Sequence, residues 1–144
     1  MILDSQLLFS DAQAVTAAAG STNTVDLSAV RDIGTGENVY VFVSVDVAFT
    51  DSGSDSTLTV ALEGDSTTSF TPDGTQDLFI MPALSAAGSV FYAKLNPGSA
   101  PLQFQYIRLK FTPNNGNLST GTVTAGIVKD IQKYLSYADA ITIS

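Results

Sequence analysis

Cysteine, histidine and tryptophan are all missing from this 144-residue chain. Without cysteine, neither disulfides nor thiolate metal sites can hold the fold, so stability must come from packing alone. Without histidine, the usual zinc ligand, the commonest general base and the Ser/His/Asp triad are excluded. These absences remove most hydrolase mechanisms and give no information on the redox compartment.

Basic residues are also scarce. Six lysines and arginines stand against fourteen acidic residues, which gives a net charge of −8. This sign does not suit phosphates or anionic lipid headgroups, so we expect neither a nucleic-acid nor a membrane partner. The N-terminal stretch MILDSQLLFSD has no basic leader, and no run of eighteen apolar residues occurs. We therefore expect synthesis in the cytoplasm without export.

The clearest positive signal is an apolar period of two. In residues 39–49, VYVFVSVDVAF, every odd position is apolar, as in a strand with one buried face, and Asp46 should point outward. After DSGSDS the alternation resumes with Leu58, Val60 and Leu62 predicted to face inward. The two runs look like strands joined by a polar loop, which we interpret as a hairpin tip.

Further strands are predicted between turns rich in Gly, Pro, Asn and Ser, and the ranges are 77–84, 89–95, 102–112 and 122–131, with weaker candidates at 13–19 and 21–27. A helix over 128–138 is the alternative for part of the last range. About eight short strands without βαβ spacing predict an all-β fold, a jelly-roll-like antiparallel β-sandwich. We expect one domain over 1–144, with an N-terminal arm at 1–12, a sandwich core at 13–131 and a C-terminal segment at 132–144.

The stretch LQFQYIRLKF changes its apolar phase. Its apolar residues begin on even positions and continue on odd positions from Ile107, which one uniform strand cannot bury on a single face. A β-bulge near Tyr106 would reconcile the two halves. Beyond it, Arg108 and Lys110 should share the outward face, either as a solvated strand surface or as a contact with an acidic partner.

The acidic residues do not form a recognisable catalytic or metal motif. Counted from Asp51, the sixth position of an EF-hand loop is Ser56 and the twelfth is Leu62, so the required glycine and glutamate are missing. An irregular cation site using Asp51 and Asp55 stays open. The only two glutamates, Glu37 and Glu63, lie beside turns, and no phosphate-binding glycine loop occurs. We therefore expect no enzyme activity and no cofactor.

Both ends of the chain resemble one protein family. Residues 7–50, with FSDAQAVT followed by STNTVDL, look like the opening of the tailed-phage capsid cement (decoration) proteins, small jelly-roll proteins that bind the outside of heads built from an HK97-type shell protein. The ending VKDIQKYLSYADAITI, residues 128–143, is similar to that family's closing segment, with Tyr137, Ala138 and Asp139 before a final apolar strand. Ala140 stands where the family would have a glycine.

The resemblance implies a structural role on the outer surface of the virion, where the protein would clamp neighbouring major-capsid-protein capsomers against internal DNA pressure. The expected partners are that HK97-type shell protein and further copies of this chain, with a dimer favoured over a trimer by the common symmetry of oligomers. The candidate contact residues are Ile2, Leu3, Leu7, Leu8, Phe9, Arg108, Lys110 and Tyr137.

Two alternatives remain open from the sequence. The apolar N-terminal arm either docks on the shell or packs on its own sandwich. A carbohydrate- or receptor-binding module of a phage particle would share the sandwich fold, although such sites usually present aromatic platforms and this chain has no tryptophan. A platform could still come from its five tyrosines, which are Tyr40, Tyr92, Tyr106, Tyr134 and Tyr137.

Overall fold

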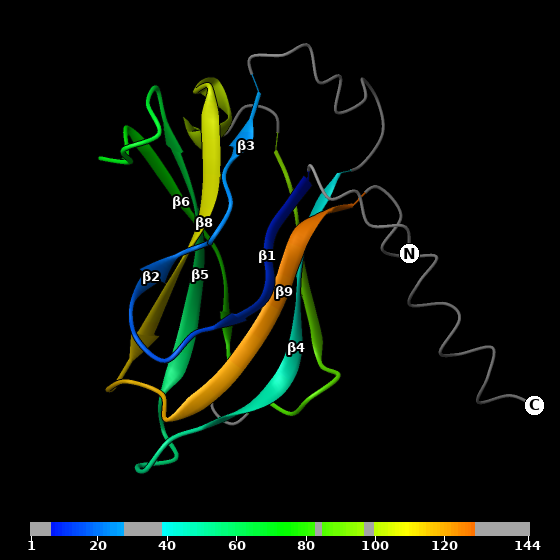
Figure 1. Ribbon diagram of the computed structural model, residues 1–144, viewed down its shortest axis with the longest axis vertical. Coiled ribbons are helices and arrows are strands. Elements are labelled where there is room, and N and C mark those ends of the chain that lie inside the picture. The colour runs from blue at the N-terminus through cyan, green and yellow to red at the C-terminus, as the bar shows by residue number, and fades with distance from the viewer. Residues whose placement is uncertain (1–6, 28–38, 83–84, 97–99, 129–144) are drawn as a thin grey trace, which may run out of the picture.

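The computed structural model describes residues 7–27, 39–82, 85–96 and 100–128 and shows two antiparallel sheets packed face to face (Figure 1). Sheet A has the order β1-β9-β4-β7, with bounds Leu8–Ala14, Thr120–Val128, Tyr40–Thr50 and Val90–Lys94. Sheet B has the order β2-β8-β5-β6, with bounds Ala19–Gly20, Tyr106–Asn114, Thr57–Asp65 and Gly74–Met81. Strand β3, Val25–Asp26, also pairs with β8.

The strand pairs are nested. Strand β5 pairs with β6, β4 with β7, β2 and β3 with β8, and β1 with β9, all antiparallel. The chain thus behaves as one long hairpin that is rolled up so that successive pairs alternate between the sheets. If β2 and β3 count as two parts of one strand, eight strands form a jelly roll, so the predicted fold is confirmed.

The core lies between the sheets and follows the predicted alternation over most of its length. Val41, Val43 and Val45 are buried on β4, as are Leu58, Val60 and Leu62 on β5. Val47 was predicted inward but is 50% exposed. The register of β4 against β9 slips on both sides of Val47, so extra residues in β4 turn this side chain outward before Phe49 returns to the core.

The predicted bulge near Tyr106 is wrong. Strand β8 pairs with β5 without any slip from Thr57 opposite Asn114 to Asp65 opposite Tyr106. The change of phase arises because a 3₁₀ helix, η2 (Ala100–Gln103), precedes the strand. Strand β8 starts at Tyr106, so Leu102 and Phe104 precede it, and its buried residues keep a single phase from Ile107 onward.

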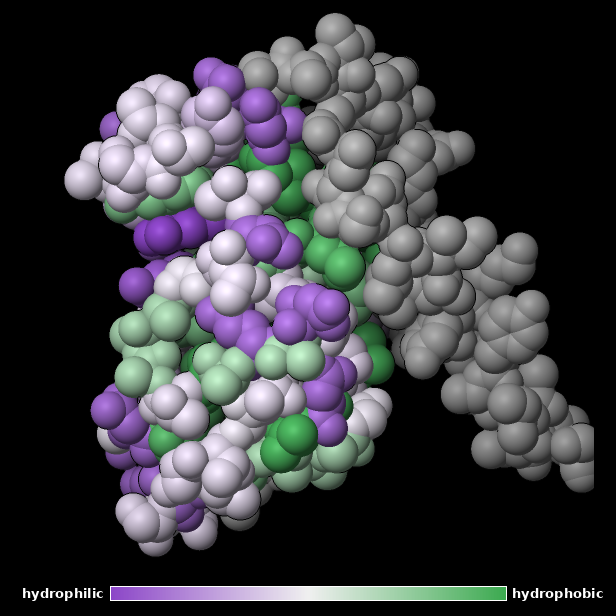
Figure 2. Space-filling view, in the orientation of Figure 1, coloured by the Kyte–Doolittle hydropathy of each residue, from purple (hydrophilic) through white to green (hydrophobic). Residues whose placement is uncertain are grey.

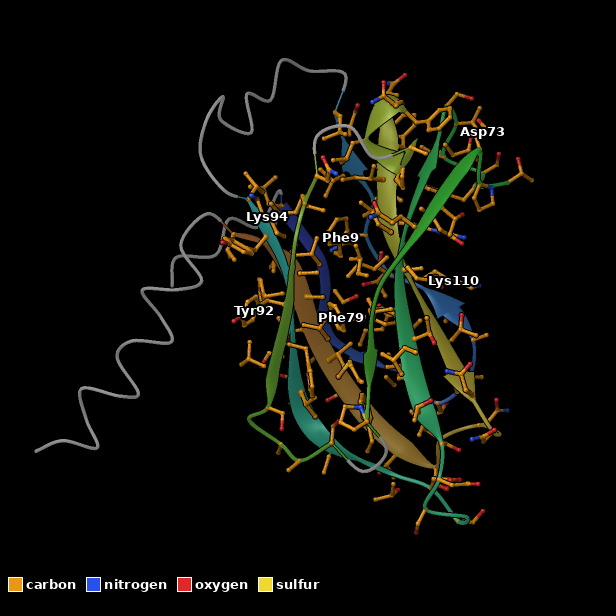
Figure 3. The ribbon with its side chains drawn as sticks, turned by 180° about the vertical axis from the view of Figure 1, so that it is seen from behind. Phe9, Asp73, Phe79, Tyr92, Lys94 and Lys110 are labelled. Carbon is orange, nitrogen blue, oxygen red and sulfur yellow. The ribbon has the colours of Figure 1, made fainter. Side chains whose placement is uncertain are left out.

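The N-terminal arm was expected to reach residue 12, but β1 begins at Leu8 and lies beside β9. Phe9 is fully buried in the core, between the two sheets in Figure 3. Of the two alternatives for this stretch, Leu8 and Phe9 follow the second, packing on their own sandwich. Residues 1–6, the C-terminal segment 132–144 and all of the alternative helix beyond Val128 lie outside the described residues.

DSGSDS does not join paired strands, so its interpretation as a hairpin tip is wrong. Strand β4 pairs with β7 and β9 in sheet A, whereas β5 pairs with β6 and β8 in sheet B. The loop is a corner that carries the chain from one sheet to the other. Alternation on both sides of a polar loop fits either arrangement, so the pattern alone could not distinguish them.

Candidate binding surfaces

The outer face of sheet A carries an apolar cluster, here called the outer cluster. Phe42 and Val128 are its buried members, and three partly buried residues pack against them: Leu8, Tyr40 and Val90. Phe42 is fully buried although it lies on the side of β4 opposite the core residues Val41 and Val43. Strand β4 is therefore covered on both faces at its start.

Gly126 makes this packing feasible. It lies on β9 between its register partners Leu8 and Phe42. A Cβ atom at position 126 would come within 3.1 Å of both Leu8 Cδ2 and Phe42 Cε1. The absence of a side chain lets the Leu8 and Phe42 side chains meet over the glycine, and this close approach explains why the cluster forms here.

Tyr92 extends the cluster toward the edge of the sheet. It is the register partner of Phe42 and remains 43% exposed. Its ring meets the Tyr40 ring edge to face, with centroids 6.0 Å apart and an interplanar angle of 79°. In Figure 3 the Tyr92 side chain projects on the side of β7 away from the core. The outer face thus presents an aromatic pair to solvent, which is a frequent feature of binding surfaces.

The other end of this face is polar. Thr124 donates a 2.6 Å hydrogen bond from its hydroxyl to Asp46 Oδ2, which confirms that Asp46 points outward. The hydroxyls of Thr50 and Thr120 lie 2.7 Å apart on neighbouring strands. The outer face of sheet A therefore changes from apolar to polar along β4 and β9.

The outer face of sheet B is organised around Arg108. Its Nε donates a 2.8 Å hydrogen bond to Glu63 Oε2, in an ion pair whose side chains are 22% and 8% exposed, respectively. The Phe70 ring lies over the guanidinium, 4.4 Å from its Cζ atom. At Gly20 a Cβ atom would lie 2.8 Å from the Arg108 Nη1 atom, so the bare glycine leaves room for the arginine.

Arg108 and Lys110 share the outward face of β8, as predicted, but Arg108 does not contribute a free charge. Its guanidinium is already paired with Glu63 and covered by Phe70. Lys110 is partly exposed and points away from the sandwich in Figure 3. The predicted basic patch is thus Lys110 beside an arginine whose charge is already paired with Glu63.

A second acidic side chain is buried where β5 ends. Asp65 is 2% exposed, and its Oδ1 accepts hydrogen bonds from the backbone N–H and hydroxyl of Thr67 at 2.9 and 3.3 Å. Oδ2 has no hydrogen-bond partner among the residues that the structure describes. The hydrogen bond to the N–H two residues on is an Asx-turn, so Asp65 starts the loop that brings Phe70 over Arg108.

The DSGSDS corner is held together by Asp51. Its Oδ2 accepts a 2.9 Å hydrogen bond from the Ser56 hydroxyl and longer ones from the backbone N–H groups of Asp55 and Ser56. The Ser56 hydroxyl bond is the main reason that the pKa of the Asp51 carboxyl is lowered. An acceptor already occupied by three donors is poorly placed to bind a cation. In the described ranges, no group of three or more acidic residues gathers as a metal site would require.

The predicted contact residues thus separate in space. Leu7 packs against the core, Leu8 joins the outer cluster, and Phe9 is inside the sandwich. Ile2, Leu3 and Tyr137 lie outside the described residues. Sequence reasoning missed the outer cluster, although one signal was available. Tyr40 and Phe42 occupy the even positions of VYVFV, which makes the start of β4 apolar in both phases, as in a strand covered on two sides.

The topology defines the class of this protein, a single jelly-roll sandwich. Its family is shown by comparison with family models, in which the Bbp16 model matches residues 9–127, nearly the whole described sandwich. The chain belongs to the Bbp16 family, which is phage-related. No curated protein matches the chain. No helix in the described part of the chain is long and apolar enough to cross a bilayer.

Proposed function

We propose that this protein is a capsid decoration protein that binds the outer surface of a phage head and clamps neighbouring capsomers of an HK97-type shell. The observation that carries the proposal is the match of residues 9–127 to a phage-related family. The resemblance of both chain ends to the cement proteins and the jelly-roll topology support the same role. The role needs no catalytic group, in keeping with our expectation that the protein is not an enzyme.

A clamp acts by mass action. A protein that binds the assembled, expanded shell but not its separated subunits lowers the free energy of the assembled state. Several weak contacts joined in one rigid body give an avidity far above that of any single contact. The jelly roll supplies the rigid body, because its two sheets share one continuous core.

The outer cluster and Tyr92 are the proposed shell-facing surface. Tyr92 is among the most exposed large apolar side chains that the structure describes, and it lies against the half-buried Tyr40. Burying a partly exposed aromatic side chain is favourable at roughly 25 cal/mol per Å² of apolar surface. The self-paired Arg108 and Glu63 on the opposite face would gain less from a partner, because their charges already satisfy each other.

Co-sedimentation tests this proposal. Expanded capsids that lack the protein are mixed with the purified chain and pelleted, and unexpanded shells provide the matched control. We expect saturable binding to expanded capsids and increased resistance of those capsids to heat or chelator. A chain that stays in the supernatant at every concentration would sink the proposed role.

A second function is favoured by one observation. The exposed Tyr92 ring beside Tyr40 offers the kind of aromatic platform on which sugars stack. A carbohydrate- or receptor-binding module of the phage particle would use that platform instead of binding the shell. Binding on a glycan array, abolished by Tyr92→Ala, together with no binding to capsids, would select this second function.

A further inference from the structure

The turn between β8 and β9 contains the only Asn-Gly pair of the sequence, Asn115–Gly116. Both residues are exposed, and both have positive φ angles, 64° and 112°, respectively. Asparagine and glycine tolerate this left-handed region better than other residue types, so the backbone of the turn accounts for their presence. The same pair is chemically reactive, because no side chain on the glycine shields its nitrogen from the asparagine side chain.

The two groups that would react are accessible. The Asn115 Nδ2 atom makes one long hydrogen bond in the described part of the chain, 3.4 Å to the Asp55 carbonyl oxygen. The Gly116 N–H has no hydrogen-bond acceptor among the described residues. A Cβ atom at position 116 would meet Ser56 Oγ at 3.9 Å and no other atom within 4 Å beyond its chain neighbours. The end of the sandwich that carries this turn is mostly pale or purple in Figure 2, so the turn lies in a polar region open to water.

We propose that Asn115 is a site of spontaneous deamidation through its own backbone. The Gly116 nitrogen loses its proton to solvent hydroxide and attacks Asn115 Cγ, and the Cγ–Nδ2 bond breaks as Nδ2 leaves as ammonia with a proton from water. Because both groups belong to adjacent residues, the step is intramolecular and closes a five-membered succinimide ring. Water then opens the ring. Cleavage of the new N–Cγ bond gives aspartate, whereas cleavage of the original peptide bond gives isoaspartate, and neither step needs an oxidant or a reductant.

The neighbouring asparagines do not combine these features. Asn114 ends β8, and its Nδ2 atom donates hydrogen bonds to the hydroxyls of Thr57 and Thr59 at 3.2 and 2.8 Å. Asn114 and Asn117 are each followed by a residue with a side chain, which hinders attack by the backbone nitrogen. They serve as internal controls, because all three asparagines lie in one short stretch of the chain.

A second pair, Asp73–Gly74, could form the same ring by losing water, but its packing opposes the reaction. Gly74 is buried at the start of β6, where a Cβ atom would lie 2.9 Å from the Phe104 ring and 3.1 Å from the carbonyl carbon of Ala100. The Asp73 N–H donates a 2.9 Å hydrogen bond to the Gly64 carbonyl oxygen. Ring closure requires rotation of the backbone between the two residues, and this packing leaves no room for it.

Modification of Asn115 changes a contact between two connections of the sandwich. The β8–β9 turn meets the β4–β5 corner at the lower end of Figure 1, where the buried Ser56 hydroxyl lies 3.3 and 3.4 Å from the carbonyl oxygens of Asn115 and Gly116. A carboxylate at position 115 removes the donor to Asp55 and adds a negative charge to a chain of net charge −8. Isoaspartate also inserts its Cβ atom into the main chain, which lengthens the turn and displaces both carbonyls. The inference goes beyond the proposed function, because it concerns the free chain and needs no capsid.

Peptide mass spectrometry of the purified chain, incubated in mildly alkaline buffer, gives the first test. We expect deamidation of Asn115 to be at least about tenfold faster than that of Asn114 or Asn117, which corresponds to a barrier lower by about 1.4 kcal/mol. The reaction should slow in mildly acidic buffer, because the attacking nitrogen must lose its proton. An unmodified Asn115 after prolonged incubation, or equal rates at the three asparagines, would overturn the proposal.

Variants at position 115 provide the second test. Asn115→Gly accepts the positive φ and has no side-chain amide, so it should keep the wild-type melting temperature and form no acidic species on ion exchange. Acidic species that accumulate in this variant at the wild-type rate would assign the reaction to another residue.

The isoaspartate form, separated from the wild type, tests the structural consequence. It should melt at least about 3 °C below the unmodified chain, because the longer turn disturbs the corner at Ser56. Freshly purified Asn115→Asp is the matched control, since it carries the new charge without the extra backbone atom, and its melting temperature should fall by about 2 °C or less. Equal melting of the isoaspartate form and the unmodified chain would refute the role of this turn in holding the corner.

Discussion

The side chains on the two outer faces of the sandwich find their interaction partners in different ways. On sheet B, Arg108 and Glu63 pair at 2.8 Å, and the loop after β5 places Phe70 over the guanidinium. On sheet A, Phe42 and Val128 are buried in a cluster that leaves Tyr92 43% exposed. The first face is completed by the chain itself, whereas the second keeps an aromatic side chain in contact with water.

This difference separates structural residues from candidates for binding. Charged residues attracted attention in the sequence because they are rare, yet Arg108 already has its partner within the fold. The tyrosines of β4 and β7 were only part of a possible aromatic platform in the sequence, and in the structure Tyr40 and Tyr92 meet on the outer face of sheet A, where Tyr92 stays 43% exposed. On this molecule, an available surface is better recognised by unburied apolar area than by charge.

Among the changes that test this comparison of the two faces, removing the Phe42 side chain should have the largest effect on stability. Phe42→Ala should lower the free energy of unfolding by about 3–5 kcal/mol, as for a fully buried phenylalanine, although the residue lies on an outer face. Val47→Ser is the control on the same strand, where a 50% exposed side chain should change stability by no more than about 0.5 kcal/mol. Denaturant unfolding measures both. Equal effects would mean that the outer cluster is not packed.

Breaking the ion pair of sheet B should have the next largest effect. Glu63→Ala leaves the covered guanidinium without its partner and should cost about 1–3 kcal/mol, less than for a fully buried pair because Arg108 keeps 22% exposure. The double change of Glu63→Leu with Arg108→Met should recover most of this loss, because apolar side chains of similar size can replace a buried pair. A double variant less stable than Glu63→Ala would contradict this account.

A negative charge introduced on each of the two outer faces should weaken capsid binding unequally. Leu8→Asp, which places a charge in the outer cluster, should weaken co-sedimentation with expanded capsids by about tenfold or more. Lys110→Glu should weaken it by less than about fivefold and only at low salt, because exposed ion pairs contribute about 0–1 kcal/mol. Thermal melts confirm that both variants are folded. A stronger effect from Lys110→Glu would assign the shell contact to sheet B.

Deleting Met1–Gln6 tests the remaining part of the expected arm without removing Leu8 from β1. The truncated chain should fold, because β1 begins at Leu8. If these residues, which include Ile2 and Leu3, add one of several linked contacts, capsid binding should weaken, although less than for Leu8→Asp. Unchanged binding by the folded truncation would leave the shell contact to the sandwich alone.

The corner between the sheets should show the smallest effect. The hydrogen bond from the Ser56 hydroxyl lowers the pKa of the Asp51 carboxyl below its ordinary 3.8. The ionised carboxylate therefore stabilises the fold above pH 3.8, and this stabilisation is lost as the pH falls through the lowered pKa. Asp51→Asn should remove that acid-side loss and shift the melting temperature at pH 7 by about 2 °C or less. Calcium should not change the melting temperature of the wild type. A calcium-dependent rise that disappears in Asp51→Asn would restore the cation site.

The sequence was sufficient to predict the class of fold because each strand buries one face. The alternation in β4 and β5 predicts that Val43 and Val60 are core residues, and both side chains are fully buried. It could not identify the extra residues in β4 that expose Val47, because a bulge depends on the partner strand. The sequence also could not show to which sheet each strand belongs, because this too depends on which strands pair.

The candidate binding surfaces were less predictable than the fold. The outward direction of Arg108 followed from the strand phase, but its pairing depends on Glu63, 45 residues away in sequence. Phe70 covers this pair from a loop whose shape begins with the Asp65 turn, and nothing in the apolar pattern indicates where a loop folds back. The outer cluster similarly depends on Gly126, because the missing side chain leaves room for Leu8 and Phe42 to approach each other.

The pairing of β1 with β9 also limits the order in which the strands can fold during synthesis. Leu8 lies opposite Gly126, so β1 must wait until β9 has been synthesised. At about 5–20 residues per second, this interval is roughly 6–24 s, during which Phe9 has no finished core to enter. The β5–β6 hairpin, whose partners are close in sequence, can form long before then. Among the described strands, β1 is consequently made first but is among the last to reach its native position, and a nascent chain leaves it unpaired until β9 has been made.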